Sequence, residues 1–92
     1  MKTISEEKIN TYIALTTKAI KKVKIVKNKE QAADMLDMAQ RYLSDAQHFK
    51  EKDDFVNAFA CVNYAHGWLD AGARLEFFDV GKDNKLFTVD DE

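Results

Sequence analysis

The 92-residue chain has 46% hydrophobic and 33% charged residues, no proline, three glycines and a formal net charge of -2 at pH 7. This composition favours long uninterrupted helices over a turn-rich β fold or a disordered chain, and the length allows one hydrophobic core, so we predict one all-α domain over residues 1–92. No segment approaches the run of about 20 apolar residues that a membrane span requires, and the first twelve residues lack the apolar run of a signal peptide, so we expect a soluble protein without membrane contact.

The first predicted helix has a clear start. Thr3 to Glu6 fits a capping box, and Ser5 as the N-cap puts Ile4 and Ile9 at the positions of a hydrophobic staple. Side chains of one face then recur at spacings of three and four: Ile9, Tyr12, Ile13, Thr16, Ile20 and Val23. We predict a helix over about residues 4–26.

A second helix is predicted because the apolar pattern loses its phase after Val23. Its stripe is Ala32, Met35, Leu36, Ala39, Tyr42, Leu43, Ala46 and Phe49. At about 100° per residue this stripe lies some 220° out of register with the first, which predicts a break rather than one long helix. Asn28 as the N-cap, with Gln31 completing the box, gives a helix over about residues 29–51.

The third helix is predicted over about residues 54–79, with Asp53 or Asp54 as its N-cap. Its apolar arc of roughly 200° is wide enough to cover two neighbours, which predicts the central helix of the bundle. The arc contains Phe55, Ala58, Phe59, Cys61, Val62, Ala65, Trp68, Leu69, Gly72 and Leu75.

Glycine and cysteine add three expectations. Gly67 and Gly72 each cost about 0.5 to 1 kcal/mol of helix propensity, so we expect a packing reason for them. Gly81 suits a C-terminal cap, and in the tail, residues 80–92, the short apolar cluster of Leu86, Phe87 and Val89 is expected to fold back onto the bundle. The single Cys61 cannot form an internal disulfide and is typical of a reducing compartment, which predicts a cytoplasmic location.

Together these elements predict an antiparallel three-helix bundle with a short C-terminal tail packed on it. The runs SDAQHFKEKDDF and DDFVNAFACVNYAHGWLDAGARLEFF, followed by LFTV, resemble an archaeal family of small proteins known as domain of unknown function 357. The strongest part of the likeness is YAHGWLDAGARL; the first helix matches mainly by its pattern. The resemblance implies a bundle of the albumin-binding-domain-like type and no particular activity.

Charge is unevenly distributed along the chain. Residues 1–29 carry a net charge of +6 and residues 30–92 carry -8. One end of the first helix gathers Lys18, Lys21, Lys22, Lys24, Lys27 and Lys29. Such a cluster can neutralise the phosphates of a nucleic acid. We favour a solvated helix end, because no aromatic residue for base stacking is interleaved and the chain is acidic overall.

Two edges of the third helix hold candidate interaction residues. Along the border of the apolar arc, Asn63, His66, Asp70 and Arg74 fall at i, i+3, i+7 and i+11. His66 and Asp70 could share a metal or transfer a proton, but two ligands are too few for a closed site and Asp70 with Arg74 forms an ordinary i, i+4 ion pair, so we expect no metal and no cofactor.

The second edge is the strip of Ala60, Gly67 and Ala71, next to Tyr64. Small residues allow another helix to approach closely, so a second chain or the 86–89 cluster could lie there; a bare helix surface is an equal alternative.

Arg41 and His48 stand seven apart on one face of the second helix, a spacing that also occurs in the signature of the HEPN ribonucleases. Any Arg and His on one helix have a fair chance of this spacing, so the indication is weak. We therefore predict a non-enzymatic interaction or scaffold module that binds a protein partner or itself as a homodimer. The alternatives are an RNA-associated protein that uses the lysine cluster and a HEPN-like RNA-acting enzyme.

Overall fold

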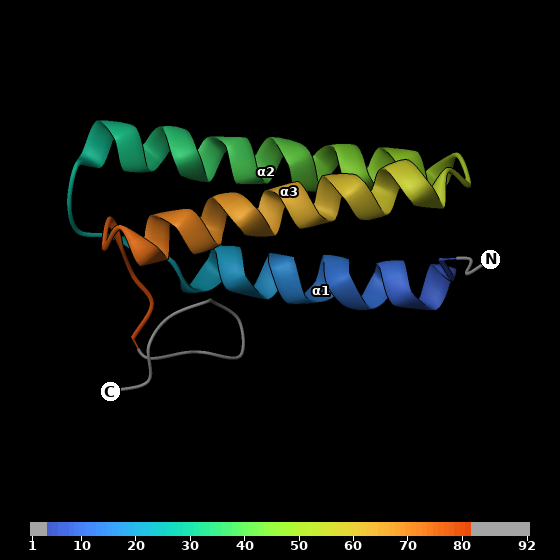
Figure 1. Ribbon diagram of the computed structural model, residues 1–92, viewed down its shortest axis with the longest axis horizontal. Coiled ribbons are helices and arrows are strands. Elements are labelled where there is room, and N and C mark those ends of the chain that lie inside the picture. Colours follow the sequence, from blue (N-terminus) through green and yellow to red (C-terminus); the bar gives the residue numbers. More distant parts are fainter. Residues whose placement is uncertain (1–3, 82–92) are drawn as a thin grey trace.

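Three helices lie side by side in the computed structural model, which describes residues 4–81 (Figure 1). They are α1 (Glu6–Lys22), α2 (Lys29–Glu51) and α3 (Phe55–Arg74). Consecutive helices run in opposite directions, so α1 and α3 point the same way (Figure 1). The predicted all-α three-helix fold is thus confirmed, whereas the albumin-binding-domain-like type and the single domain over 1–92 stay predictions. The tail cluster at 86–89 lies outside the described residues.

Two helices are shorter than the predicted ranges of 4–26 and 54–79, because the segments beyond them pair with each other. β1 (Lys24–Ile25) and β2 (Phe78–Asp79) form an antiparallel ladder in which Lys24 faces Asp79 and Ile25 faces Phe78. The Val26 N–H extends the ladder by donating to the Phe77 carbonyl at 3.0 Å. β-branched residues at 23, 25 and 26 favour extended backbone, so this segment leaves the helix and joins the ladder.

α3 ends at a Schellman motif rather than at the predicted glycine cap. Glu76 adopts the left-handed conformation, with φ 62°, and its N–H donates to the Ala73 carbonyl at 3.1 Å. The Phe77 N–H donates to the Gly72 carbonyl at 3.0 Å, which completes the motif. Gly81 also has a positive φ but lies beyond β2, so it does not cap the helix. Leu75, predicted within the apolar arc, falls after the helix end and is 53% exposed.

The predicted start of α2 at residue 29 is correct, but the predicted cap is not. Asn28 is left-handed, with φ 48°, and its side chain makes no capping hydrogen bond, so the Asn28–Gln31 capping box is wrong. Two other caps are confirmed: the Ser5 hydroxyl accepts the Lys8 N–H at 3.1 Å, and the Asp54 carboxylate accepts the Asn57 N–H at 3.2 Å. Side-chain oxygens at these positions satisfy amides that the first helical turn leaves unpaired.

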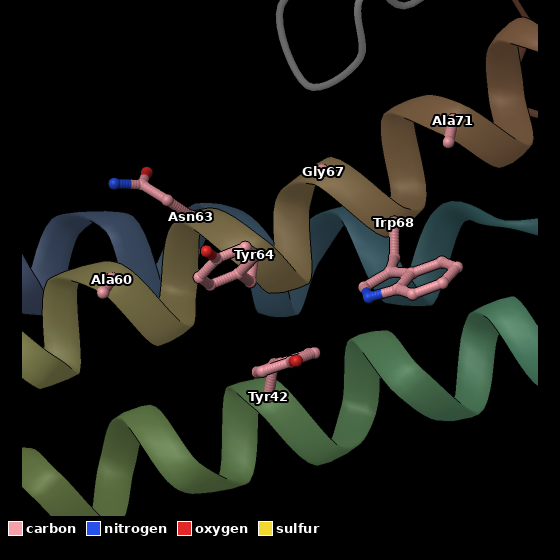
Figure 2. Close-up of a pocket in the computed structure, with 7 residues that line it drawn as sticks. All are labelled: Tyr42, Ala60, Asn63, Tyr64, Gly67, Trp68 and Ala71. Carbon is pink, nitrogen blue, oxygen red and sulfur yellow. The ribbon is translucent and has the colours of Figure 1, made fainter.

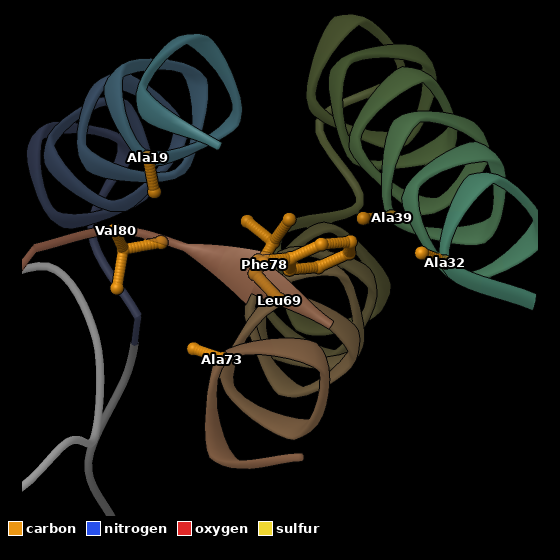
Figure 3. Close-up of a cluster of buried hydrophobic side chains, with 7 residues drawn as sticks. All are labelled: Ala19, Ala32, Ala39, Leu69, Ala73, Phe78 and Val80. Atoms are coloured by element: carbon orange, nitrogen blue, oxygen red, sulfur yellow. The ribbon is translucent and has the colours of Figure 1, made fainter. Parts of the chain in front are cut away.

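α3 packs against both other helices, as its wide apolar arc predicts. Large and small buried side chains alternate along it, and Leu69 and Val62 are at most 1% exposed. Near its C-terminal end, seven buried residues from all three helices and from the segment around β2 form one cluster: Ala19, Ala32, Ala39, Leu69, Ala73, Phe78 and Val80 (Figure 3). The Phe78 ring occupies the space that a Cβ on Gly72 would need, which is the packing reason expected for that glycine.

Candidate functional site

A groove runs along the outer seam between α2 and α3. It has a volume of about 590 Å³ and is lined by Tyr42 of α2 and by six residues of α3: Ala60, Asn63, Tyr64, Gly67, Trp68 and Ala71 (Figure 2). We call it the aromatic groove. It contains the whole predicted strip of small residues together with Asn63 from the predicted polar border, so the two predicted edges of the third helix meet here.

Three aromatic side chains form the wall of the aromatic groove. Tyr64 is 63% exposed and stacks on the half-buried ring of Tyr42, with ring centroids 5.4 Å apart and planes inclined by 26°. The half-buried Trp68 lies one turn further along α3, on the same seam (Figure 2). Aromatic rings of this kind offer a large contact area at a low cost in side-chain entropy, which is why they dominate binding surfaces.

The floor of the aromatic groove is bare helix backbone. A Cβ built on Gly67 meets no atom within 4 Å among the described residues, so no packing reason for this glycine is found there. Ala60 and Ala71 lie on either side of it along the helix and add only methyl groups (Figure 2). A floor of small residues lets a second backbone approach closely.

A second, smaller pocket of about 320 Å³ lies on the α1 side of Gly67. Its lining comes from α1 and α3: Tyr12, Leu15, Thr16, Val62, Asn63, His66, Gly67 and Asp70. We call it the histidine pocket. Asn63 and Gly67 line both hollows, so they lie on the ridge of α3 that separates them. Arg74, the last residue of the predicted border, lines neither hollow.

His66 has a polar neighbour at each ring nitrogen. Nδ1 lies 3.4 Å from the hydroxyl of Thr16, and Nε2 lies 3.8 Å from Oδ1 of Asp70. The Thr16 hydroxyl can donate or accept, depending on the imidazole tautomer. The hydroxyl and the carboxylate flank the ring on opposite sides, and the 3.8 Å separation from Asp70 is longer than a hydrogen bond. Thr16 is only 1% exposed, which leaves its hydroxyl little access to a substrate.

No chemical role is predicted for Thr16 from the sequence, because it is one position of the apolar stripe on the first helix. The available signal was a lone hydroxyl among aliphatic side chains, since a buried hydroxyl needs a hydrogen-bond partner on a neighbouring element. Tyr42 was missed because it lies on α2, whereas the strip of small residues that it faces across the aromatic groove lies on α3.

Within residues 4–81, no three His, Cys, Asp or Glu side chains gather closely enough to hold a metal ion.

The remaining candidates lie apart from both hollows. Arg41 and His48 are exposed on α2, and the Arg41 Nε donates to the Asp37 carboxylate at 2.8 Å. The cluster of six lysines is exposed at the end of the bundle where α1 finishes and α2 begins: Lys18, Lys21, Lys22, Lys24, Lys27 and Lys29. The structure therefore brings the α3 candidates other than Arg74 to the two adjoining hollows and leaves the α2 pair and the lysines as separate surface features.

Cys61 is a half-buried free thiol on α3. Burial raises its pKa above the 9.0 of an unperturbed thiol, and the negative charges of Asp45 and Asp54 raise it further. Cys61 is therefore protonated at neutral pH, which removes the thiolate that a nucleophile or a metal ligand needs.

Comparisons with known proteins give one match. No helix in residues 4–81 has both the length and the apolar character to cross a bilayer. No curated protein and no solved structure matches the chain. A family described as "Protein of unknown function (DUF357)" matches residues 11–78, from the second turn of α1 to the first residue of β2. The match thus includes most of the first helix, for which the resemblance noted in the sequence rests mainly on the pattern. Because the match spans most of the chain, the protein belongs to the DUF357 family.

Proposed function

We propose that this protein is a small non-enzymatic interaction module that binds a protein partner through the aromatic groove. The observation that carries the proposal is the exposed ring of Tyr64, stacked on Tyr42 beside the open floor at Gly67. Residues 4–81 offer this ring no further cover, so a partner is what would bury it. Apolar burial is worth about 25 cal/mol per Å² of surface removed from water, which makes such a ring an effective anchor.

The shape of the aromatic groove favours a helical partner. It follows the seam between two helices, its wall is aromatic and its floor consists of small residues (Figure 2). Helix-in-groove binding uses apolar anchors at helical spacing on the partner, and the small floor residues allow the close approach that this packing needs. The proposal includes an archaeal and cytoplasmic setting: the family resemblance supports the first, and the free thiol of Cys61 supports the second.

The test is capture from an extract of the source cells with three tagged forms of the full chain: wild type, Gly67→Glu and Ala33→Glu. Gly67→Glu puts a charged side chain on the groove floor, where residues 4–81 leave room for it. Ala33→Glu adds the same side chain at an exposed position of α2. We expect proteins that are retained by wild type and by Ala33→Glu and lost with Gly67→Glu. Equal retention by all three forms contradicts the proposal.

A second candidate, RNA association, rests on one observation. All six lysines of the cluster are exposed at the same end of the bundle, although they come from α1, β1, the turn after β1 and the start of α2. Such an arrangement gives non-specific affinity for phosphates that falls steeply with salt. The test is a gel shift with RNA at low salt, repeated after changing Lys18, Lys21, Lys22 and Lys24 to Glu. No shift at micromolar protein ends this candidate, and nuclease treatment of the captured sample separates it from the first.

A further inference from the structure

Resting on the proposed function, we propose that the occupant of the aromatic groove is a second copy of this chain. The two α3 helices pack antiparallel about a two-fold axis that passes midway between Tyr64 and Gly67. Each copy contributes the same surface, as in most dimers of identical chains. Three features of the described residues support this arrangement: the shape of the groove, the position of the axis along α3, and the distribution of charge.

The groove is complementary to itself. Tyr64 projects from it with 63% of its surface exposed, and three residues further on Gly67 leaves an opening in which a Cβ would meet nothing within 4 Å among residues 4–81. An antiparallel pair with its axis midway between these residues sets Tyr64 of each copy over Gly67 of the other. The ring then fills the opening and loses its exposed surface, as a knob fills a hole between packed helices. The same pairing therefore buries the exposed Tyr64 ring and occupies the space beside Gly67.

The other α3 residues of the groove fall into register about the same axis. Ala60 comes to lie opposite Ala71, so the two backbones can approach closely on both sides of the central contact. Asn63 and Trp68 project to opposite sides of α3 (Figure 2), so they flank this contact on its α1 side and its α2 side. The axis also falls close to the middle of α3 (Phe55–Arg74), so two helices of about 30 Å overlap along their whole length.

Charge selects the antiparallel orientation. At the end of the bundle where α1 finishes, the described positive side chains are Lys18, Lys21, Lys22, Lys24, Lys27, Lys29 and Arg74, against Glu30, Asp34, Asp70, Glu76 and Asp79. At the opposite end the described acids are Glu6, Glu7, Asp45, Glu51, Asp53 and Asp54, against Lys8, Lys50 and Lys52. Among the described residues the first end is therefore net positive and the second net negative. Antiparallel pairing sets the positive end of each copy beside the negative end of the other, whereas parallel pairing sets like charges together.

Self-association is tested by sedimentation equilibrium of the full chain, from about 1 µM to about 500 µM at low salt, with the Gly67→Glu and Ala33→Glu variants alongside. We expect wild type and Ala33→Glu to pass from the mass of one chain to the mass of two, and Gly67→Glu to raise the dissociation constant at least tenfold. Raising the salt weakens the dimer, because surface charge attraction is screened. Circular dichroism checks that all three forms are equally helical. A single-chain mass for wild type over the whole range overturns the inference.

Orientation is tested by oxidative crosslinking of Ala60→Cys and Ala71→Cys, each made in a Cys61→Ser background. In the antiparallel dimer the two positions face each other, so a mixture of the two variants crosslinks. Two copies of the same variant are kept about 16 Å apart along the helix axis, so neither crosslinks alone. Crosslinking of Ala60→Cys to itself overturns the antiparallel arrangement.

The outcomes separate this inference from the proposed function. If wild type stays monomeric while Gly67→Glu still loses captured proteins, the second copy is the wrong occupant and the groove binds another protein. If wild type dimerises and Gly67→Glu dimerises with the same dissociation constant, the dimer does not use the groove and the inference is overturned. A dimer that Gly67→Glu abolishes, with the crosslink between positions 60 and 71, supports it.

Discussion

Gly67 and Gly72 lie five positions apart on α3 and meet opposite surroundings. Gly72 is buried, and a Cβ added there would overlap the ring of Phe78. Gly67 is exposed, and a Cβ added there would meet nothing within 4 Å among the described residues. The ring of Phe78 therefore occupies the space beside Gly72, whereas no residue within 4–81 occupies the space beside Gly67.

The difference shows that the stability lost at a glycine within a helix can be offset by a contact that only a glycine permits. Each glycine lowers helix stability by about 0.5 to 1 kcal/mol relative to alanine. At Gly72 the buried Phe78 ring offsets this cost, because full burial of such a side chain is worth about 1.5 to 3 kcal/mol. At Gly67 residues 4–81 supply no such gain, and the proposed second copy would supply it by seating a tyrosine ring there.

Removal of the Phe78 ring is the change with the largest expected effect on this comparison. Phe78 is 3% exposed in the cluster that joins the three helices (Figure 3), so we expect Phe78→Ala to lower the free energy of unfolding by about 3 to 5 kcal/mol. Urea unfolding followed by circular dichroism measures it. Val56→Ala, at a 71% exposed position of α3, is the control and should change stability by less than about 0.5 kcal/mol. A cost below about 1 kcal/mol at Phe78 would mean that the cluster does not close over the glycine.

Filling the buried glycine comes next. In Gly72→Ala the new methyl group overlaps a ring that is itself enclosed, so we expect a loss of about 1 to 3 kcal/mol despite the better helix propensity of alanine. The double variant with Phe78→Ala separates the two contributions. Without the ring there is no overlap, so Gly72→Ala should then cost nothing or stabilise the protein. Equal costs in the presence and absence of the ring would show that the overlap is not the cause.

The same substitution at the open glycine has the opposite expected sign. Gly67→Ala meets no described atom within 4 Å, so the monomer should gain about 0.5 to 1 kcal/mol from helix propensity alone. The measurement is urea unfolding at the lowest protein concentration that gives a signal, because self-association would otherwise stabilise the wild type. A loss of stability at low concentration contradicts the open surroundings of Gly67.

Much of the fold could be predicted because it follows from local patterns. The periodic stripes around Ile9, Ala39 and Val62 predicted three helices, and the width of the third stripe predicted α3 as the shared centre. The helix N-caps at Ser5 and Asp54 could also be predicted from the sequence, since an oxygen-bearing side chain just before an apolar stripe is a local signal for a helix start.

The missed helix ends depend on contacts between distant parts of the chain. Lys24 of β1 pairs with Asp79 of β2, far away in the sequence, and the preference of Val23, Ile25 and Val26 for extended backbone does not by itself show where the partner strand lies. Part of the site was missed for the same reason. The strip of small residues around Gly67 is a periodic feature of one helix, whereas Tyr42 and Thr16 join the two hollows only after the helices pack.

The smallest expected effect lies at Glu76, just beyond Gly72, where α3 ends so that Phe77 and Phe78 can turn back. Its φ of 62° costs a residue with a side chain about 1 kcal/mol or more, and glycine avoids this cost but loses more backbone entropy on folding. We expect Glu76→Gly to stabilise the protein by about 0.5 kcal/mol net. Asp53 ends α2 in the same way, with φ 59°, but aspartate tolerates this conformation better, so Asp53→Gly should gain less. Thermal unfolding of both variants, with Glu76→Ala as a control that keeps the Cβ, measures the difference. If Glu76→Ala gains as much as Glu76→Gly, the loss of the carboxylate is the cause and the strained turn is not.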